Sequence, residues 1–106
     1  RVFCVRIKRE VVLYKDTWIY KILKDHPEVD GRIPLIKDTL VKTDSKITAY
    51  KKKRDHNELA IYREGCVEMG YFKYLRIGLK VNNPKLATMA TAFGDDSNPP
   101  EEMENL

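Results

Sequence analysis

Residues 71–93, "YFKYLRIGLKVNNPKLATMATAF", contain the clearest strand pattern of the chain. Apolar and polar side chains alternate through 74–81, the pattern of a half-buried strand, because successive side chains of a strand point to opposite faces. A turn at 82–84 then leads into a second strand over 85–93, which predicts an antiparallel hairpin. Its apolar face should pack under helices and its other face should be positively charged. The apolar residues are Leu75, Ile77, Leu79 and Val81, and the opposite ones are Tyr74, Arg76, Gly78 and Lys80.

Two further hairpins precede this one in the chain. Residues 47–53 and 58–64 alternate in the same way around a polar turn at 54–57. Residues 2–7 and 11–14 are rich in β-branched and aromatic side chains and flank a charged turn. The sequence therefore predicts a short N-terminal β-hairpin and four longer strands.

Two helices are predicted between the first and second hairpins. Asp16 is the candidate N-cap of the first helix. That helix ends before Pro27, because proline pushes the preceding residue out of the α region, and His26 is then its last residue. A second short helix follows over 33–40, with Pro34 in the first turn, where proline is tolerated. The apolar stripe of the first helix consists of Trp18, Ile19, Ile22 and Leu23.

These elements predict an α+β fold. Two N-terminal helices should pack on a twisted antiparallel sheet of about four strands, preceded by the short β-hairpin. The chain has 106 residues and is 42% hydrophobic, which suits one domain with its own core. We assign that domain to residues 1–94. Residues 95–106 contain two prolines, five acids and no aliphatic side chain before Leu106, which predicts a disordered acidic tail.

Positive charge is concentrated in the predicted domain. The chain has 20 Lys and Arg against 16 Asp and Glu. Because the tail holds five of the acids and no base, residues 1–94 carry a net charge of +9. A body this basic attracts polyanions, and nucleic acid is the first candidate. The alternative is a basic domain that is merely soluble.

Other features narrow the class of protein. Cys4 and Cys66 allow one disulfide at most, and we expect two reduced thiols because the count is so low. There is no Cys-x-x-Cys or Cys/His cluster, so no metal site is expected. The apolar runs are too short for a membrane span. The chain starts at Arg1 without a methionine or a signal peptide, and we expect it to be part of a longer protein.

The side chains required for RNA cleavage without a metal are present. That reaction needs a base for the 2′-OH proton, an acid for the leaving 5′-oxygen and cations for the phosphate charge. His26 and His56 are candidates for proton transfer, and Arg76, Lys80 and the run "KKKR" (51–54) are candidates for the charge. No Gly-rich phosphate loop, no Gly-x-Ser-x-Gly and no carboxylate cluster for two magnesium ions is present.

Each of these candidates has a structural alternative. A protonated His26 also suits a helix C-terminus electrostatically, and His56 lies in a predicted turn. The charged strand face is equally consistent with an ordinary solvated surface. Strand alternation places either Thr88 or Thr91 on the open side of the sheet, and spacing alone leaves both choices open.

Five short motifs follow one another along the chain. They are W-x-x-K-I-L-K-D-H-P-E (18–28), I-x-x-I-K-D-T-L (33–40), A-Y-K-K (49–52), Y-L-R-I-G-L-K-V (74–81) and M-A-T-A-F (89–93). Their order resembles the phage-associated branch of the barnase–EndoU–colicin–RelE (BECR) nuclease superfamily, over roughly residues 11–93. Members often have another histidine earlier on the first helix. This chain has Tyr20 and Lys21 there, so the identity of the general base stays open.

The resemblance implies a metal-independent endoribonuclease domain without a cofactor, often a toxin, with tRNA as a frequent target. Its catalytic residues would be His26 as general base or acid, Arg76 and Lys80 on the phosphate, and Thr91 as a hydrogen-bond donor that orients it. For contacts to flanking RNA we predict a further set: Lys21, Lys51, Lys52, Lys53, Arg54 and Tyr74.

The predicted partners follow from the same argument. They are RNA and an acidic immunity or antitoxin protein that covers the basic face, because complementary charge speeds encounter. We expect a monomer that acts in the cytoplasm without membrane contact, delivered as the C-terminal domain of a longer secreted or phage protein. Two other classes stay open: a non-catalytic nucleic-acid-binding or phage accessory protein, and an adaptor for an acidic protein.

Overall fold

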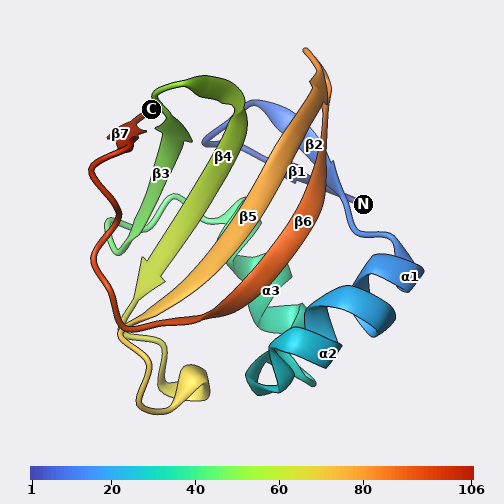
Figure 1. Cartoon of the computed structure of the whole chain (residues 1–106), viewed down its shortest axis with the longest axis vertical. Coiled ribbons are helices and arrows are strands. Elements are labelled where there is room, and N and C mark those ends of the chain that lie inside the picture. Colours follow the sequence, from blue (N-terminus) through green and yellow to red (C-terminus); the bar gives the residue numbers. More distant parts are fainter.

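A seven-stranded sheet forms the centre of the computed structural model, which describes residues 1–106 (Figure 1). The strand order is β1-β2-β6-β5-β4-β3-β7, and every neighbouring pair is antiparallel except β2 and β6. The strands are β1 (Val2–Cys4), β2 (Arg9–Val12), β3 (Ile47–Lys52), β4 (Asp55–Glu64), β5 (Tyr74–Asn83), β6 (Leu86–Asp95) and β7 (Met103–Asn105).

Strand β5 lies in the middle of this sheet, and its side chains alternate between buried and more exposed positions as predicted. It pairs with β4 on one side and β6 on the other, so both of its edges are hydrogen-bonded. Leu75 and Ile77 are 0% exposed and Leu79 is 2% exposed. They belong to one cluster of 20 buried residues between the sheet and the helices. Burial of the apolar side chains in this cluster is the main favourable contribution to folding in a chain of this size.

One continuous helical segment covers residues 15–25. It consists of α1 (Lys15–Thr17), the π-helical turn η1 (Trp18–Ile22) and α2 (Leu23–Asp25). The Leu23 N–H donates to the Trp18 carbonyl, an i to i+5 bond that widens the turn. Trp18 and Ile22 of the predicted apolar stripe are buried, but Ile19 of the same stripe is 40% exposed. The predicted N-cap was wrong: Tyr14 occupies that position without a side-chain cap bond, and Asp16 lies inside the first turn.

The second helix follows a sharp change of direction at Pro27. His26 leaves the helical region at φ −136° and ψ 71°, and the short 3-10 turn η2 (Pro27–Val29) leads to α3 (Ile33–Val41). Figure 1 shows α3 behind the sheet and the helical segment beside β6. The Arg63 guanidinium of β4 donates to Asp38 Oδ2 at 2.9 Å and so ties α3 to the sheet. The predicted α+β architecture, with two helices and an N-terminal hairpin, is confirmed.

The strand count and the sheet type differ from the prediction of about four antiparallel strands. The N-terminal hairpin joins the main sheet, because Val11 of β2 pairs in parallel with Ala87 of β6. The predicted disordered tail also differs, because β7 pairs with the free edge of β3. The Lys53 N–H donates to the Glu102 carbonyl at 2.7 Å, and the Leu106 N–H donates to the Ala49 carbonyl at 3.1 Å. An open strand edge offers such bonds to any extended segment, whatever its composition.

None of the helices has the length and apolar character needed to cross a bilayer. Cys4 and Cys66 are unpaired and buried, at 0% and 6% exposure. Burial raises the pKa of both thiols above the ordinary value. Both sulfurs are therefore protonated at neutral pH and shielded from reagents.

The burial of the two thiols gives a direct test of the fold. Because only an exposed thiolate reacts readily, Cys4 and Cys66 should label with a thiol reagent at neutral pH at least about 100-fold more slowly in the native protein than in guanidinium. The unfolded sample is the control and should show both thiols. Rapid labelling of Cys66 in the native protein would contradict the packing of the β4–β5 connection.

Candidate functional site

The candidate site lies on the face of β3 to β6 that is opposite the apolar core, here called the open face. Strand register brings its side chains into rows across the sheet, because paired residues of antiparallel strands point to the same side. Tyr62, Arg76 and Phe93 form one row. The open face also carries Tyr50, Lys52, Glu58, Tyr74, Gly78, Lys80, Thr88 and Thr91.

A cavity of about 160 Å³ opens on this face and collects three of the four predicted catalytic residues. Arg76, Lys80 and Thr91 all line it. Two basic side chains and a hydroxyl around one small hollow suit an anion of phosphate size. The remaining lining is Lys52, Glu58, Leu59, Gly78, Leu79, Ala90, Glu102 and Met103.

Gly78 and a bulge in β6 shape the floor of the cavity. A Cβ on Gly78 would lie 2.7 Å from the Thr91 Cγ2 methyl, so Thr91 packs where a side chain would stand. The register shifts between the Gly78–Thr91 and Leu79–Met89 pairs. Because this bulge adds a residue to β6, Thr88 and Thr91 both point to the open face instead of opposite ones. Thr91 lines the cavity, whereas the Thr88 hydroxyl accepts a 2.6 Å bond from Asn82 Nδ2.

Arg76 is held between two aromatic rings on the open face. Its Cζ atom is 5.4 Å from the Tyr62 ring centroid and 5.3 Å from that of Phe93, which is cation–π contact. Its Nη1 is 3.7 Å from Asp95 Oδ2. Its Nε is buried without a hydrogen-bond partner. Lys80, in contrast, is exposed and forms no ion pair, so it is free to meet an anion.

His26 reaches this site through Phe93. The imidazole stacks on the Phe93 ring with centroids 4.7 Å apart and planes 23° from parallel. Its Nδ1 is 3.7 Å from Glu28 Oε2, and the same carboxylate oxygen accepts the Gly94 N–H at 3.0 Å. The end of β6 therefore fixes the carboxylate that lies beside the imidazole. His26 is both the helix C-cap and a neighbour of the Arg76 cluster.

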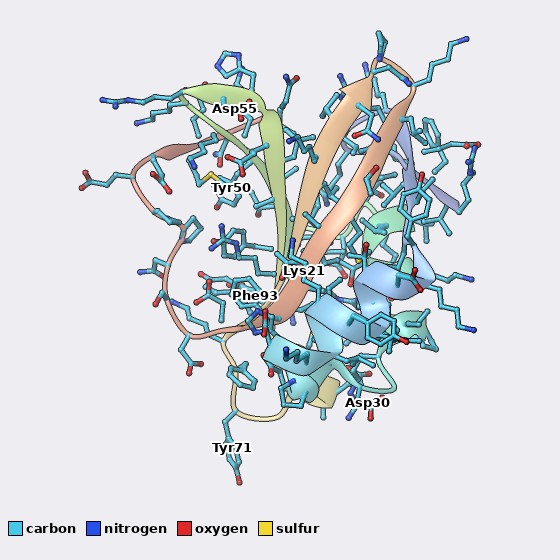
Figure 2. The ribbon with its side chains drawn as sticks, turned by 45° about the vertical axis from the view of Figure 1, so that its right-hand side comes forward. Lys21, Asp30, Tyr50, Asp55, Tyr71 and Phe93 are labelled. Atoms are coloured by element: carbon cyan, nitrogen blue, oxygen red, sulfur yellow. The ribbon has the colours of Figure 1, made fainter.

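The second histidine lies at the other end of the sheet. His56 is next to Asp55, near the turn between β3 and β4, and Figure 2 shows Asp55 at the opposite end from Phe93. His56 lies six positions before Tyr62 in β4, and Tyr62 pairs with Arg76, so roughly 20 Å of strand separates His56 from the row of Arg76. His56 Nε2 is instead 3.9 Å from Glu104 of β7. The two histidines therefore cannot act on one phosphate.

The predicted RNA-contacting residues divide between paired and free cations. Lys51 Nζ is 3.6 Å from Glu104 Oε1, and Lys52 Nζ is 3.1 Å from Glu58 Oε2. Lys53 and Arg54 are exposed at the β3–β4 turn without an ion pair. Lys21 is exposed on the helical segment, which Figure 2 shows beside the sheet. Tyr74 is half-buried, and its hydroxyl lies 3.4 Å from Asn98 Oδ1.

Sequence reasoning named Tyr74 but missed several other residues of the site. Tyr50, Tyr62 and Tyr74 form a row across three strands, with successive rings edge-on at 5.3 Å. Burial raises the pKa of Tyr62, whose hydroxyl has no partner. The signal was a tyrosine at an outward position of each strand, which becomes a row only once the register is known. Glu28, Glu58 and Phe93 were missed for the same reason.

Comparison with protein-family models, curated proteins and solved structures finds no match to this chain. The motif resemblance to BECR nucleases is therefore untested by any relative, and it stays a prediction. What this site does has to follow from its own geometry and charge.

Replacing Phe93 tests the link between His26 and Arg76. Phe93→Leu should remove both ring contacts and lower the free energy of unfolding by about 1 kcal/mol. The His26 ring protons should then lose the upfield ring-current shift in the ¹H NMR spectrum. Phe3→Leu, on the half-exposed Phe3 of β1, is the matched control and should leave the His26 signals in place. Unchanged His26 signals in Phe93→Leu would contradict the stacking.

Proposed function

We propose that this protein is a metal-independent endoribonuclease that cleaves RNA through attack of a 2′-OH on the adjacent phosphate. The convergence of Arg76, Lys80 and Thr91 on one cavity of the open face supports the proposal most strongly. These residues come from two strands, and together they offer two positive charges and a hydroxyl to one anion. Lys52 adds a third cation to the same lining.

In this proposal the scissile phosphate binds over Gly78. Arg76 and Lys80 stabilise the extra negative charge that develops on the non-bridging oxygens as the 2′-oxygen attacks. The guanidinium is already oriented by the Tyr62 and Phe93 rings, so little reorganisation is needed when the charge forms. Thr91 donates a hydrogen bond that fixes the phosphate.

Two side chains that can transfer protons lie on either side of this position: one on β4 and one at the end of the first helical segment. Glu58 pairs with Lys80 in the strand register and lines the cavity at one end, while His26 lies beyond the Arg76–Phe93 row at the other. We assign Glu58 as the general base and His26 as the general acid, because a carboxylate can accept the 2′-OH proton and an imidazole can pass a proton to the leaving oxygen. Glu58 takes the 2′-OH proton as the O2′–P bond forms. His26 gives a proton to O5′ as the P–O5′ bond breaks, leaving a 2′,3′-cyclic phosphate and a 5′-OH.

Flanking RNA would follow the charged rim of the open face. Lys51, Lys52, Lys53 and Arg54 suit the phosphate backbone on one side, and Lys21 suits it on the other. Tyr50 and Tyr74 offer partly exposed rings for base stacking. A toxin role, tRNA as the target, an acidic immunity protein and cytoplasmic action rest on the resemblance alone and belong to the same proposal.

A second candidate function is RNA binding without cleavage. The aromatic row and its cations favour it, because both serve a binding surface as well as an active site. Incubation of the protein with total RNA in EDTA separates the two functions. Discrete fragments with cyclic phosphate ends identify the nuclease, and a salt-sensitive complex without fragments identifies the binder.

Replacing each histidine separates catalysis from folding. His26→Ala should lower RNA cleavage by about 10²–10⁴-fold, the scale of a lost general acid. Its loss of unfolding free energy should be only about 1 kcal/mol, from the stacking on Phe93. His56→Ala is the matched control and should keep wild-type turnover, because His56 lies at the far end of the sheet. Wild-type turnover by a folded His26→Ala protein would exclude the proposed role.

The lysines allow the same comparison for the phosphate site. Lys80→Ala should lower cleavage by about 10²-fold or more through lost charge stabilisation, with little change in melting temperature. Lys37→Ala removes an exposed charge from α3, on the other side of the sheet, and should leave cleavage unchanged. Equal activity of the two variants would mean that Lys80 does not contact the reacting phosphate.

The pH dependence tests the assignment of base and acid. A mechanism that needs one deprotonated base and one protonated acid gives a bell-shaped dependence of cleavage on pH. Glu58→Gln should lower kcat/KM by about 10²-fold or more and remove the acidic limb of the residual activity. A residual profile that keeps the acidic limb would assign the base to another group.

A further inference from the structure

The C-terminal segment, residues 96–106, crosses from the end of β6 to the outer edge of β3 (Figure 1). It is attached near its start, where the Lys73 N–H donates to Asp96 Oδ1 at 3.0 Å and Lys73 Nζ donates to Asn98 Oδ1 at 2.7 Å. At its far end β7 pairs with β3, with Lys51 opposite Glu104. The segment therefore spans the rim that carries the predicted RNA-contacting lysines.

The acids of this segment lie against basic side chains that line the cavity and against others at the neighbouring β3–β4 edge. Glu102 lines the same cavity as Arg76 and Lys80. Glu104 Oε1 is 3.6 Å from Lys51 Nζ and 3.9 Å from His56 Nε2. Together with Glu101, Glu102 also borders a second hollow of about 390 Å³, lined only by charged residues, the others being Lys52, Lys53 and Arg54.

The charge environment of Lys52 agrees with this arrangement. Its pKa is raised first by the hydrogen bond and charge of Glu58 and then by the charge of Glu102. Asp95, just before the segment, lies 3.7 Å from the Arg76 guanidinium. Carboxylates thus occupy positions around the cavity that a phosphate backbone would fill.

The attachment of the segment is weak enough to be reversed. Strand β7 has three residues and pairs on one side only. The Glu104 side chain is 41% exposed, and its neighbours Lys51 and His56 are 31% and 63% exposed. Exposed pairs of this kind contribute little to stability. Short terminal strands of this kind open at low cost in free energy.

We propose that the C-terminal segment is an intramolecular competitor of RNA. Its carboxylates take the place of phosphates on the open face, and RNA binds by displacing residues 101–106 from the β3 edge. This inference rests on the proposed function, since it assumes that RNA binds the open face. Covalent attachment gives the competitor a high effective concentration, so even weak contacts lower the apparent RNA affinity.

Neutralising the acids while keeping the backbone tests this proposal. Glu101→Gln, Glu102→Gln and Glu104→Gln together preserve the main-chain bonds of Lys53 and Leu106. The matched control, Asp16→Asn, Asp30→Asn and Glu68→Asn, makes the same change in net charge at exposed positions away from the segment. The probe is a short fluorescent single-stranded RNA with 2′-O-methyl groups, which cannot be cleaved by 2′-OH attack.

The tail variant should bind this probe about three- to tenfold more tightly than the control variant at low salt. Its affinity should also fall more steeply with salt, because lysines freed from carboxylates release counterions when RNA binds. In the wild type, RNA should speed hydrogen exchange at the Lys53 and Leu106 amides as β7 leaves the edge.

The outcomes separate this inference from the function on which it rests. Equal affinity of the two triple variants, or RNA binding that leaves the Lys53 and Leu106 amides protected, would overturn the competitor and leave RNA binding intact. No binding of the probe by the wild type or by either variant would overturn the proposed function, and the competitor with it.

Discussion

Strand β5 buries the side chains of one face in the core and turns those of the other face outward, and this constraint organises the whole sheet. With β4 and β6 hydrogen-bonded to its two edges, β5 can bury Leu75, Ile77 and Leu79 only by turning the intervening residues to the opposite side. The same strand register therefore sets both the core on one face and the cationic cluster on the other. A slip of one residue in register would bury Arg76 and expose Ile77, so the packing of the apolar face also fixes the position of the site.

Aromatic rings connect this strand to the helices. Phe93 contacts Arg76 from the sheet and His26 from the helix end, while the Glu28 carboxylate beside His26 accepts the Gly94 N–H. The side chain of Phe72 packs against Gly94 so closely that a Cβ there would be 2.3 Å from its ring. The end of β6 thus holds the helix corner, the β4–β5 connection and the guanidinium in one arrangement. His26 can end the helix and also take part in the proposed site, because the same contacts to Phe93 and Glu28 hold it in both roles.

The charged side chains, unlike the packed core, are held by weak contacts at the surface. Part of the net positive charge of residues 1–94 lies close to acids of the C-terminal segment, at Lys51 and around the cavity. Exposed pairs of this kind hold little free energy and are weakened by salt. They are suited to exchange with another polyanion, which is the physical basis of the proposed competition between the C-terminal segment and RNA.

The local features of this protein could be predicted from short segments of its sequence. Period-two alternation gave the hairpins around 47–64 and 71–93, proline sterics ended the first helix at His26, and composition gave the basic domain, because each depends on neighbouring residues alone. The contacts between distant parts of the chain became known only from the tertiary structure. The pairing of β2 with β6, the β7 strand on the β3 edge, the bulge that turns Thr88 and Thr91 to one face, and the stack of His26 on Phe93 join residues far apart in the chain. Their partners are selected by the free strand edges and packing that exist only after the sheet has formed, so no local pattern could specify them.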